Sequence, residues 1–160
     1  MLMFIDGKYV AATDGQTMPV IDPTTGKSFD TVPLGGAADA DAAIKSSARA
    51  FKIWKQTPMT ERVRLQNACA TAMRTNATSL AQLLSEELGR PMPGCLQEMS
   101  RAAELLDIYA EEGLRLQGTF ALGAAHGEKT LVTRDPVGVV VAITPFIFPS
   151  IYCYSNWVQL

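Results

Sequence analysis

The sequence predicts an α/β fold in which short β-hairpins and a helical segment precede the start of a parallel sheet. Three observations predict it. A turn between two apolar stretches marks a hairpin near the N-terminus, and apolar residues then recur at spacings of three and four from residue 37 to about residue 118. Residues 137–143 form a continuous, β-branched apolar run. A run without alternation is typical of a strand that is buried on both faces of a parallel sheet.

The N-terminal part is predicted to be β structure. Asp6 and Gly7 stand between the apolar ends of residues 4–10, and both positions of such a hairpin turn require positive φ. Residues 20–29 carry a second turn signal, with a proline that presets φ and a glycine that closes the turn. We expect a strand pair at each turn, with the glycines at 35–36 ending the β region.

Four helices are predicted next, over about residues 37–57, 60–76, 78–88 and 91–118. Thr60 and Thr78 are candidate N-caps, and Gly89 stands where a glycine commonly follows the end of a helix. The periodicity places one apolar stripe on each helix. The stripe of the first helix is Ala40, Ile44, Ser47, Phe51 and Trp54; that of the second is Leu65, Cys69, Ala72 and Met73; that of the last is Met99, Ala102, Ala103, Leu106, Tyr109 and Ala110.

The C-terminal part is predicted to return to β structure. Residues 118–127 are rich in glycine and alanine, and we expect a loop or a weak strand there, followed by a strand at 129–133. Residues 137–143 are predicted to be a central strand. Three regions follow from this order: an N-terminal hairpin and helical part (1–118), a β segment (119–136), and a strand with its tail (137–160).

Composition excludes several classes of function. The formal net charge of −2 leaves no excess of cations to neutralise a phosphate backbone, so we expect no nucleic-acid partner. The longest apolar run, residues 137–149, is too short to span a bilayer, and the chain does not open on a secretory signal pattern. We therefore expect no membrane partner and a cytoplasmic protein.

The three cysteines, Cys69, Cys95 and Cys153, indicate reduced thiols, because their number is odd and their spacing matches no disulfide framework or zinc site. Cys153 and the single histidine, His126, could form a thiolate and base pair. Cys95 follows two prolines at a helix start, where the helix dipole could activate it. Since cysteine is commonly a small buried residue, we favour core packing over both alternatives.

Two segments make the pattern specific: Glu-Glu-Leu-Gly-Arg-Pro at 86–91, and Asp-Pro-Val-Gly-Val-Val-Val-Ala-Ile-Thr-Pro-Phe at 135–146. Both resemble the aldehyde dehydrogenase superfamily, to whose N-terminal strands residues 4–8 and 22–26 are also similar. The resemblance implies a fold with a Rossmann-like cofactor domain, a catalytic domain and a β-hairpin extension for oligomerisation. The 160 residues would form the truncated N-terminal part of that fold.

The resemblance also implies a cofactor, NAD or NADP, and a site for it. Ile143, Thr144, Pro145 and Phe146 match the carboxyl end of the first cofactor-domain strand, which passes beside the nicotinamide. Right after that phenylalanine the family has an asparagine that donates a hydrogen bond to the reaction's oxyanion, and here this position is Ile147.

No catalytic residue is expected in this chain, because the family's nucleophilic cysteine and general-base glutamate lie beyond the point that matches Leu160. The chain alone is therefore predicted not to oxidise an aldehyde. A second hypothesis is a non-catalytic binding module that pairs with itself or with a full-length relative through strands within 129–143, because unpaired strand edges seek partners. A third is a truncated gene product without a function.

Overall fold

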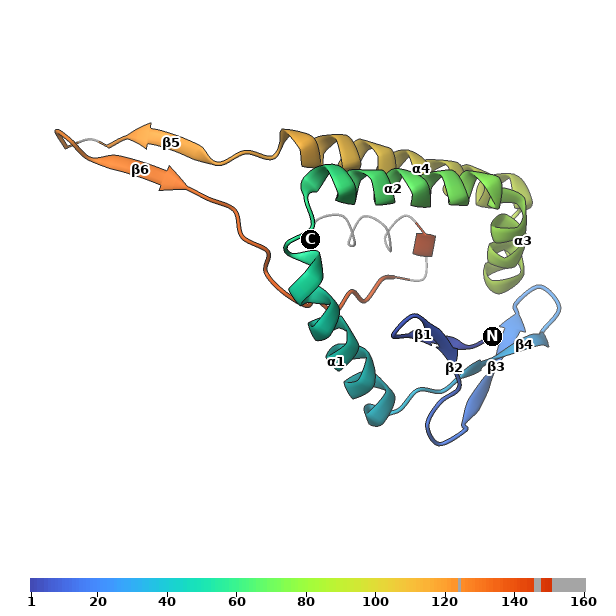
Figure 1. Ribbon diagram of the computed structural model, residues 1–160. Helices are drawn as coiled ribbons and strands as arrows, with labels where there is room; N and C mark the ends of the chain where they lie inside the picture. Colours follow the sequence, from blue (N-terminus) through green and yellow to red (C-terminus); the bar gives the residue numbers. More distant parts are fainter. Residues whose placement is uncertain (124, 146–147, 151–160) are drawn as a thin grey trace.

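The computed structural model describes residues 1–123, 125–145 and 148–150 of the chain. In chain order the elements are β1 (Met3–Ile5), β2 (Lys8–Val10), β3 (Thr17–Asp22), β4 (Lys27–Pro33), α1 (Ala37–Trp54), α2 (Met59–Thr75), α3 (Ala77–Leu88), α4 (Met92–Arg115), β5 (Thr119–Leu122) and β6 (Lys129–Val132) (Figure 1). The strands pair as three separate antiparallel hairpins: β1 with β2, β3 with β4, and β5 with β6.

The two N-terminal hairpins confirm the sequence prediction. Phe4 pairs with Tyr9 across β1 and β2, and the turn between the strands has positive φ at both Asp6 (55°) and Gly7 (74°). A right-handed strand twist favours such a turn, which explains why this dipeptide sets the register. β3 and β4 are joined by a turn in which Gly26 has a φ of 70°.

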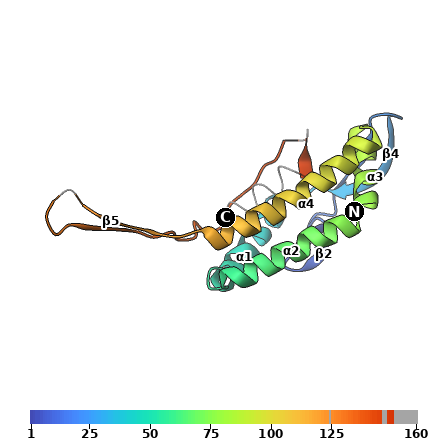
Figure 2. The same ribbon diagram turned by 90° about the horizontal axis from the view of Figure 1, so that it is seen from above.

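Helices α2, α3 and α4 form the packed part of the molecule. α2 and α4 lie side by side and run in opposite directions, and α3 crosses their far end (Figures 1 and 2). One apolar cluster joins the three helices: Ala70, Met73, Ala81, Leu84, Cys95, Met99, Ala102, Ala103 and Leu106. Its small residues let α4 approach the other two helices closely, and the stripe predicted for α4 is confirmed, except that Tyr109 is only half-buried.

The helix ends agree with prediction at one site and differ at two. Gly89 ends α3 with a φ of 64°, in the left-handed conformation that a glycine adopts without strain. Thr60 is not an N-cap: the carbonyl of Pro58 already accepts the first helical bonds of α2, which begins at Met59. Thr78 likewise lies inside α3, because the amide of Leu80 donates to the carbonyl of Asn76.

The stripes predicted for α1 and α2 are wrong in part. Ile44 and Trp54 on α1 are 51% and 43% exposed, because α1 diverges from the other helices and only Asp39 is buried on it (Figure 1). On α2 the side that packs against α3 and α4 carries Ala70 and Met73, so Leu65 and Cys69 face outward. Periodicity finds the helix but not which neighbour it meets.

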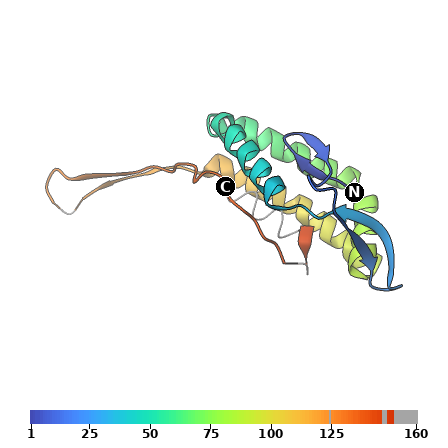
Figure 3. The ribbon, with the colours of Figure 1, turned by 90° about the horizontal axis from the view of Figure 1, so that it is seen from below.

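The third hairpin, β5 and β6, extends away from the rest of the molecule (Figures 1 and 3). β5 and β6 pair with Phe120 opposite Leu131, so part of the segment predicted as a loop or weak strand is a strand. Residues 133–145 then return toward the helices without strand structure, and Val137 and Ile143 are 78% and 89% exposed. The prediction of a buried strand at 137–143 is therefore wrong for the described structure. A strand requires a hydrogen-bonded neighbouring strand, and none of the described residues forms one beside this segment.

Candidate functional site

The segment predicted to contact the cofactor is open to its surroundings. Ile143 is 89% exposed, Pro145 is exposed and Thr144 is half-buried. Their backbone groups belong to no strand ladder among the described residues. The predicted cofactor contact Phe146 and the position of the family's oxyanion donor, Ile147, lie outside the described residues.

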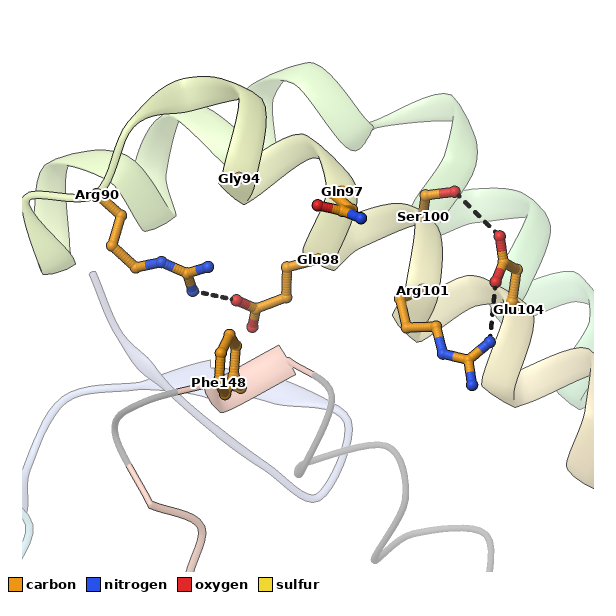
Figure 4. Close-up of a pocket in the computed structure, with 8 residues that line it drawn as sticks. All are labelled: Arg90, Gly94, Gln97, Glu98, Ser100, Arg101, Glu104 and Phe148. Atoms are coloured by element: carbon orange, nitrogen blue, oxygen red, sulfur yellow. Dashed lines mark hydrogen bonds and ion pairs between the residues drawn. The ribbon is translucent and has the colours of Figure 1, made fainter.

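A cavity of about 420 Å³ lies beside the next described residues, between the N-terminal half of α4 and Phe148 (Figure 4). It is lined by Arg90, Gly94, Gln97, Glu98, Ser100, Arg101, Glu104 and Phe148. Arg90 comes from the short linker between α3 and α4, and Phe148 follows the predicted cofactor segment. The cavity thus joins two regions that are far apart in the sequence.

Glu98 is the buried charged residue at the centre of this region, with 3% of its surface exposed. Nη1 of Arg90 donates to its Oε2 at 2.5 Å, and the backbone N–H of Ser150 donates to its Oε1 at 3.1 Å. Burial of a carboxylate costs free energy unless its oxygens are paired. Both oxygens of Glu98 have a partner, which accounts for an acid on the buried side of α4.

Arg90 is held in turn by its own backbone and by an aromatic ring. Its carbonyl oxygen accepts a hydrogen bond from Oγ of Ser85 at 2.6 Å, which fixes the linker against the last turn of α3. Its guanidinium carbon lies 4.9 Å from the centre of the Phe148 ring, within the range of a cation–π interaction. One arginine therefore contacts both the buried carboxylate and the residues after the predicted cofactor segment (Figure 4).

The charges of the cavity are balanced. Arg101 pairs with Glu104 at 3.2 Å, as Arg90 pairs with Glu98, so the lining carries two cations and two anions. A site for a phosphate or a pyrophosphate normally presents an excess of donors or a positive field. This cavity by itself does not provide one, and its carboxylates are engaged rather than free for acid and base catalysis.

The other sequence candidates that lie within the described residues, Cys95 and His126, do not converge on a site. Cys95 is completely buried in the helical core, which confirms core packing, and its Sγ lies 3.9 Å from the Arg90 carbonyl. His126 lies in the exposed connection between β5 and β6, and Cys153 lies outside the described residues. Within the described ranges no group of three or more His, Cys, Asp or Glu residues could hold a metal ion.

A second cavity, of about 610 Å³, lies where α1, α2, α4 and residues 134–137 meet. Arg62 occupies this joint: it donates to the carbonyls of Trp54 and Thr57, and its guanidinium carbon lies 5.3 Å from the centre of the Trp54 ring. These contacts close the end of α1 against the start of α2. Arg62 therefore has a structural role at the joint between α1 and α2.

Sequence reasoning missed Glu98, although a signal for it exists. Glu98 stands three residues after Cys95 and four before Ala102, at the spacing of the buried stripe of α4. A carboxylate at a core position indicates a paired buried charge, whereas Glu104 and Glu112 belong to the outer face.

In the part of the chain that the structure describes, no helix combines the length and the apolar character that a membrane span needs.

A sequence model described as the aldehyde dehydrogenase family matches residues 9–159 of the chain. Among curated proteins, 3-sulfolactaldehyde dehydrogenase of Pseudomonas putida is 36% identical over 146 residues, which cover 91% of this chain and 30% of that protein. Glutarate-semialdehyde dehydrogenase of Pseudomonas aeruginosa is 34% identical over 147 residues, with 92% and 30% covered. The chain thus spans about 30% of the length of the curated relatives it matches.

Solved structures are similar over the same extent. An aldehyde dehydrogenase from Brucella melitensis superposes with a TM-score of 0.92 at 30% identity, covering 97% of this chain and 32% of that one. The NADP-dependent glyceraldehyde-3-phosphate dehydrogenase from Bacillus halodurans, complexed with NADP, gives a TM-score of 0.90 at 30% identity, with 95% and 33% covered. The arrangement of hairpins and helices is therefore shared with these proteins.

Proposed function

Because the chain belongs to the aldehyde dehydrogenase family, we propose that it forms the N-terminal portion of an enzyme that oxidises an aldehyde to a carboxylic acid with NAD or NADP. The observation that carries the proposal is the match over residues 9–159, together with coverage of only about 30% of each curated relative. We further propose that these 160 residues alone do not catalyse the reaction.

The chemistry of the thiols supports the second part of the proposal. Oxidation through a thiohemiacetal requires a thiolate that an aldehyde can reach and a base that activates it. Cys95 is completely buried, and the exposed Cys69 lies on α2, on a different element from His126 in the far hairpin. The family resemblance puts the nucleophile and the general base beyond Leu160, and it puts Ile147, which has no side-chain donor, where the family has its oxyanion asparagine.

Residues 143–146 are the proposed cofactor contact, through their backbone groups. Ile143 and Pro145 are exposed and nothing in the described structure covers them, so a planar ring could approach this segment. The balanced charges around Glu98 do not fit the phosphates. A bound nicotinamide would accept a hydride from the carbon of the thiohemiacetal; the part of this chain is to line one side of that ring.

The test is to incubate the purified 160-residue chain with succinate semialdehyde and NAD or NADP and to follow absorbance of the reduced cofactor. We expect no aldehyde-dependent signal. Turnover comparable to that of an ordinary dehydrogenase would overturn the proposed inactivity. In parallel, the intact mass of the protein from its own cells decides whether the natural product is near 17.3 kDa or larger.

We propose an aldehyde that carries a second, anionic group as the substrate of the complete enzyme. The two curated relatives named above act on 3-sulfolactaldehyde and glutarate semialdehyde, and a succinate-semialdehyde dehydrogenase of Escherichia coli is 32% identical. Each of these aldehydes bears a sulfonate or a carboxylate. If the natural product is larger and active, kcat/KM should be higher for succinate semialdehyde than for butanal; equal values would refute this substrate class.

Self-association, or association with a full-length relative, is the second proposed function, through strands within residues 129–143. On the β5–β6 hairpin, Leu122 and Leu131 are 76% and 72% exposed, and Val137, Val141 and Ile143 after it are exposed as well. Exposed apolar surface and unpaired strand edges favour a partner. We expect dimers or larger species in analytical ultracentrifugation and their loss in Leu131→Lys, while Ile108→Lys on α4 should leave them intact. A monodisperse wild-type monomer would contradict self-association.

A further inference from the structure

The buried carboxylate of Glu98 connects two parts of the chain that are 52 residues apart, α4 and the backbone at Ser150. We propose that Glu98 is a positioning residue: with Arg90, it holds residues 148–150 against α4. These residues come two positions after the segment 143–146 in the sequence, so we expect a change at Glu98 to affect that segment as well. This last consequence rests on the proposed cofactor contact, whereas the fixing of Ser150 does not.

The geometry of the carboxylate carries the proposal. An ion pair that served only the joint between α3 and α4 would need one oxygen, the Oε2 that accepts from Arg90 at 2.5 Å. The other oxygen, Oε1, accepts from the backbone N–H of Ser150 at 3.1 Å. Because the donor is a backbone group, this contact constrains the path of the chain and not merely one side chain.

Arg90 and Phe148 add a second constraint on the same segment. The guanidinium that pairs with Glu98 also lies 4.9 Å from the centre of the Phe148 ring. Its side chain is 28% exposed and that of Glu98 only 1%, so the pair is largely removed from water and is screened little by salt. The Arg90–Glu98 pair therefore contacts this segment at two residues, Phe148 and Ser150.

Native-state hydrogen exchange of the Ser150 amide, read by NMR on the 160-residue chain, tests the proposal. We expect Glu98→Ala to raise the Ser150 exchange rate at least about tenfold, because hydrogen bonds to charged acceptors are the stronger ones. Glu98→Gln keeps an oxygen acceptor without the charge and should give a smaller increase. Glu112→Gln, the same change on the exposed face of α4, should leave the rate unchanged.

Phe148→Leu keeps the folded core and the Glu98–Arg90 pair while removing the ring from the guanidinium, so it remains informative if Glu98→Ala fails to fold. We expect it to raise exchange at Ser150 without raising exchange at core amides of α4. A wild-type Ser150 amide that exchanges at the rate of an unfolded peptide would overturn the proposal. Unchanged protection in both Glu98→Gln and Phe148→Leu would also overturn it.

Fluorescence titration with NADPH and with NADH separates the two proposals. If wild type binds either cofactor, we expect Glu98→Gln to raise Kd while Glu112→Gln does not, and an unchanged Kd would overturn the link between Glu98 and the cofactor segment. If wild type binds neither cofactor, the proposed contact at 143–146 fails for this chain. The exchange rate of Ser150 still decides whether Glu98 positions residues 148–150.

Discussion

The helical layer and the β5–β6 hairpin with residues 133–145 contain the same kinds of apolar residue in opposite surroundings. Leu84 and Leu106 are 6% and 4% exposed, whereas Leu131 on the hairpin is 72% exposed and Ile143 is 89% exposed. Hydrophobicity alone therefore does not decide burial. The difference lies in whether the chain supplies a packing partner.

The partners of the helical layer come from nearby in the sequence. α4 packs against both α2 and α3, and the three helices follow one another in the chain with only short connections between them. Residues 137–143 instead have the composition of a strand buried between other strands, and no described strand pairs with them. The helices of the first region pack against one another, whereas residues 137–143 have no such partner among the described residues.

The largest expected effect comes from truncating a buried leucine. Leu106→Ala should lower the free energy of unfolding by about 2–5 kcal/mol, because it removes buried methyl groups and leaves a cavity between α2 and α4. Leu131→Ala, the same change on the exposed hairpin, should change it by no more than about 0.5 kcal/mol at a protein concentration too low for self-association. Urea unfolding followed by circular dichroism measures both. Similar losses in the two variants would show that the hairpin is part of the cooperative core.

A smaller effect is expected from a glycine at the edge of the helical layer. Gly89→Ala forces an alanine to a φ of +64°, which costs about 1–2 kcal/mol, and its Cβ would stand 2.9 Å from Cγ of Pro23 in the β3–β4 turn. Gly127→Ala in the far hairpin causes the same kind of backbone strain, at a φ of +82°, but no atom lies within 4 Å of the added Cβ.

The hairpin can relieve that strain by opening locally, so Gly127→Ala should cost less global stability than Gly89→Ala. The pair of variants is measured by the same urea titration. If Gly127→Ala is the more destabilising, the far hairpin is coupled to the core more strongly than its exposure indicates.

Much of the fold could be predicted because its signals are local. The Asp6-Gly7 turn demands positive φ at both residues, and Gly89 ends a helix for the same reason, so the sequence locates both features. The faces of α1 and α2 could not be predicted in this way. Periodicity says that one side of a helix is apolar, but Ile44 is exposed because α1 diverges from the other helices, which is a tertiary fact.

The candidate site shows the same limit more sharply. The sequence motif at residues 135–146 identifies the family, yet it says nothing of what holds the residues that follow. That information lies in Glu98, whose partners Arg90 and Ser150 come from opposite directions along the chain. Only the structure brings the three together, although the position of Glu98 in the apolar stripe of α4 indicates that it has a buried partner.

The start of α1 is held by polar contacts and should respond to acid. The Asp39 carboxylate at the start of α1 accepts hydrogen bonds from the hydroxyl and amide of Thr13 and the amide of Gly36. The Thr13 hydroxyl first, and these amides, lower the pKa of Asp39 below its ordinary value of 3.8. A lowered folded-state pKa means stability that is present above about pH 4 and is lost as pH falls through the folded value.

Asp39→Asn should therefore lower the Tm at pH 7 and reduce the further drop in Tm between pH 4 and pH 2. Asp41→Asn, a matched change on the exposed face of α1, should keep the wild-type acid profile. Differential scanning calorimetry at each pH measures both variants. An acid profile of Asp39→Asn identical to that of wild type would show that the bonds to Thr13 and Gly36 do not link α1 to the N-terminal hairpins.

The smallest effect concerns a charge within the helical layer. Burial raises the pKa of Glu87 above its ordinary value of 4.5, so the fold favours the neutral carboxyl and loses stability as pH rises past the folded value. Glu87→Gln should then increase the free energy of unfolding at pH 7, by no more than about 0.5 kcal/mol, and have no effect at pH 3, where wild type is also neutral. Glu86→Gln serves as the control, since it is the same change at the neighbouring position, where the carboxylate accepts a hydrogen bond from Nε2 of Gln82 at 3.1 Å. A gain that persists at pH 3 would mean that packing, and not charge, limits this end of α3.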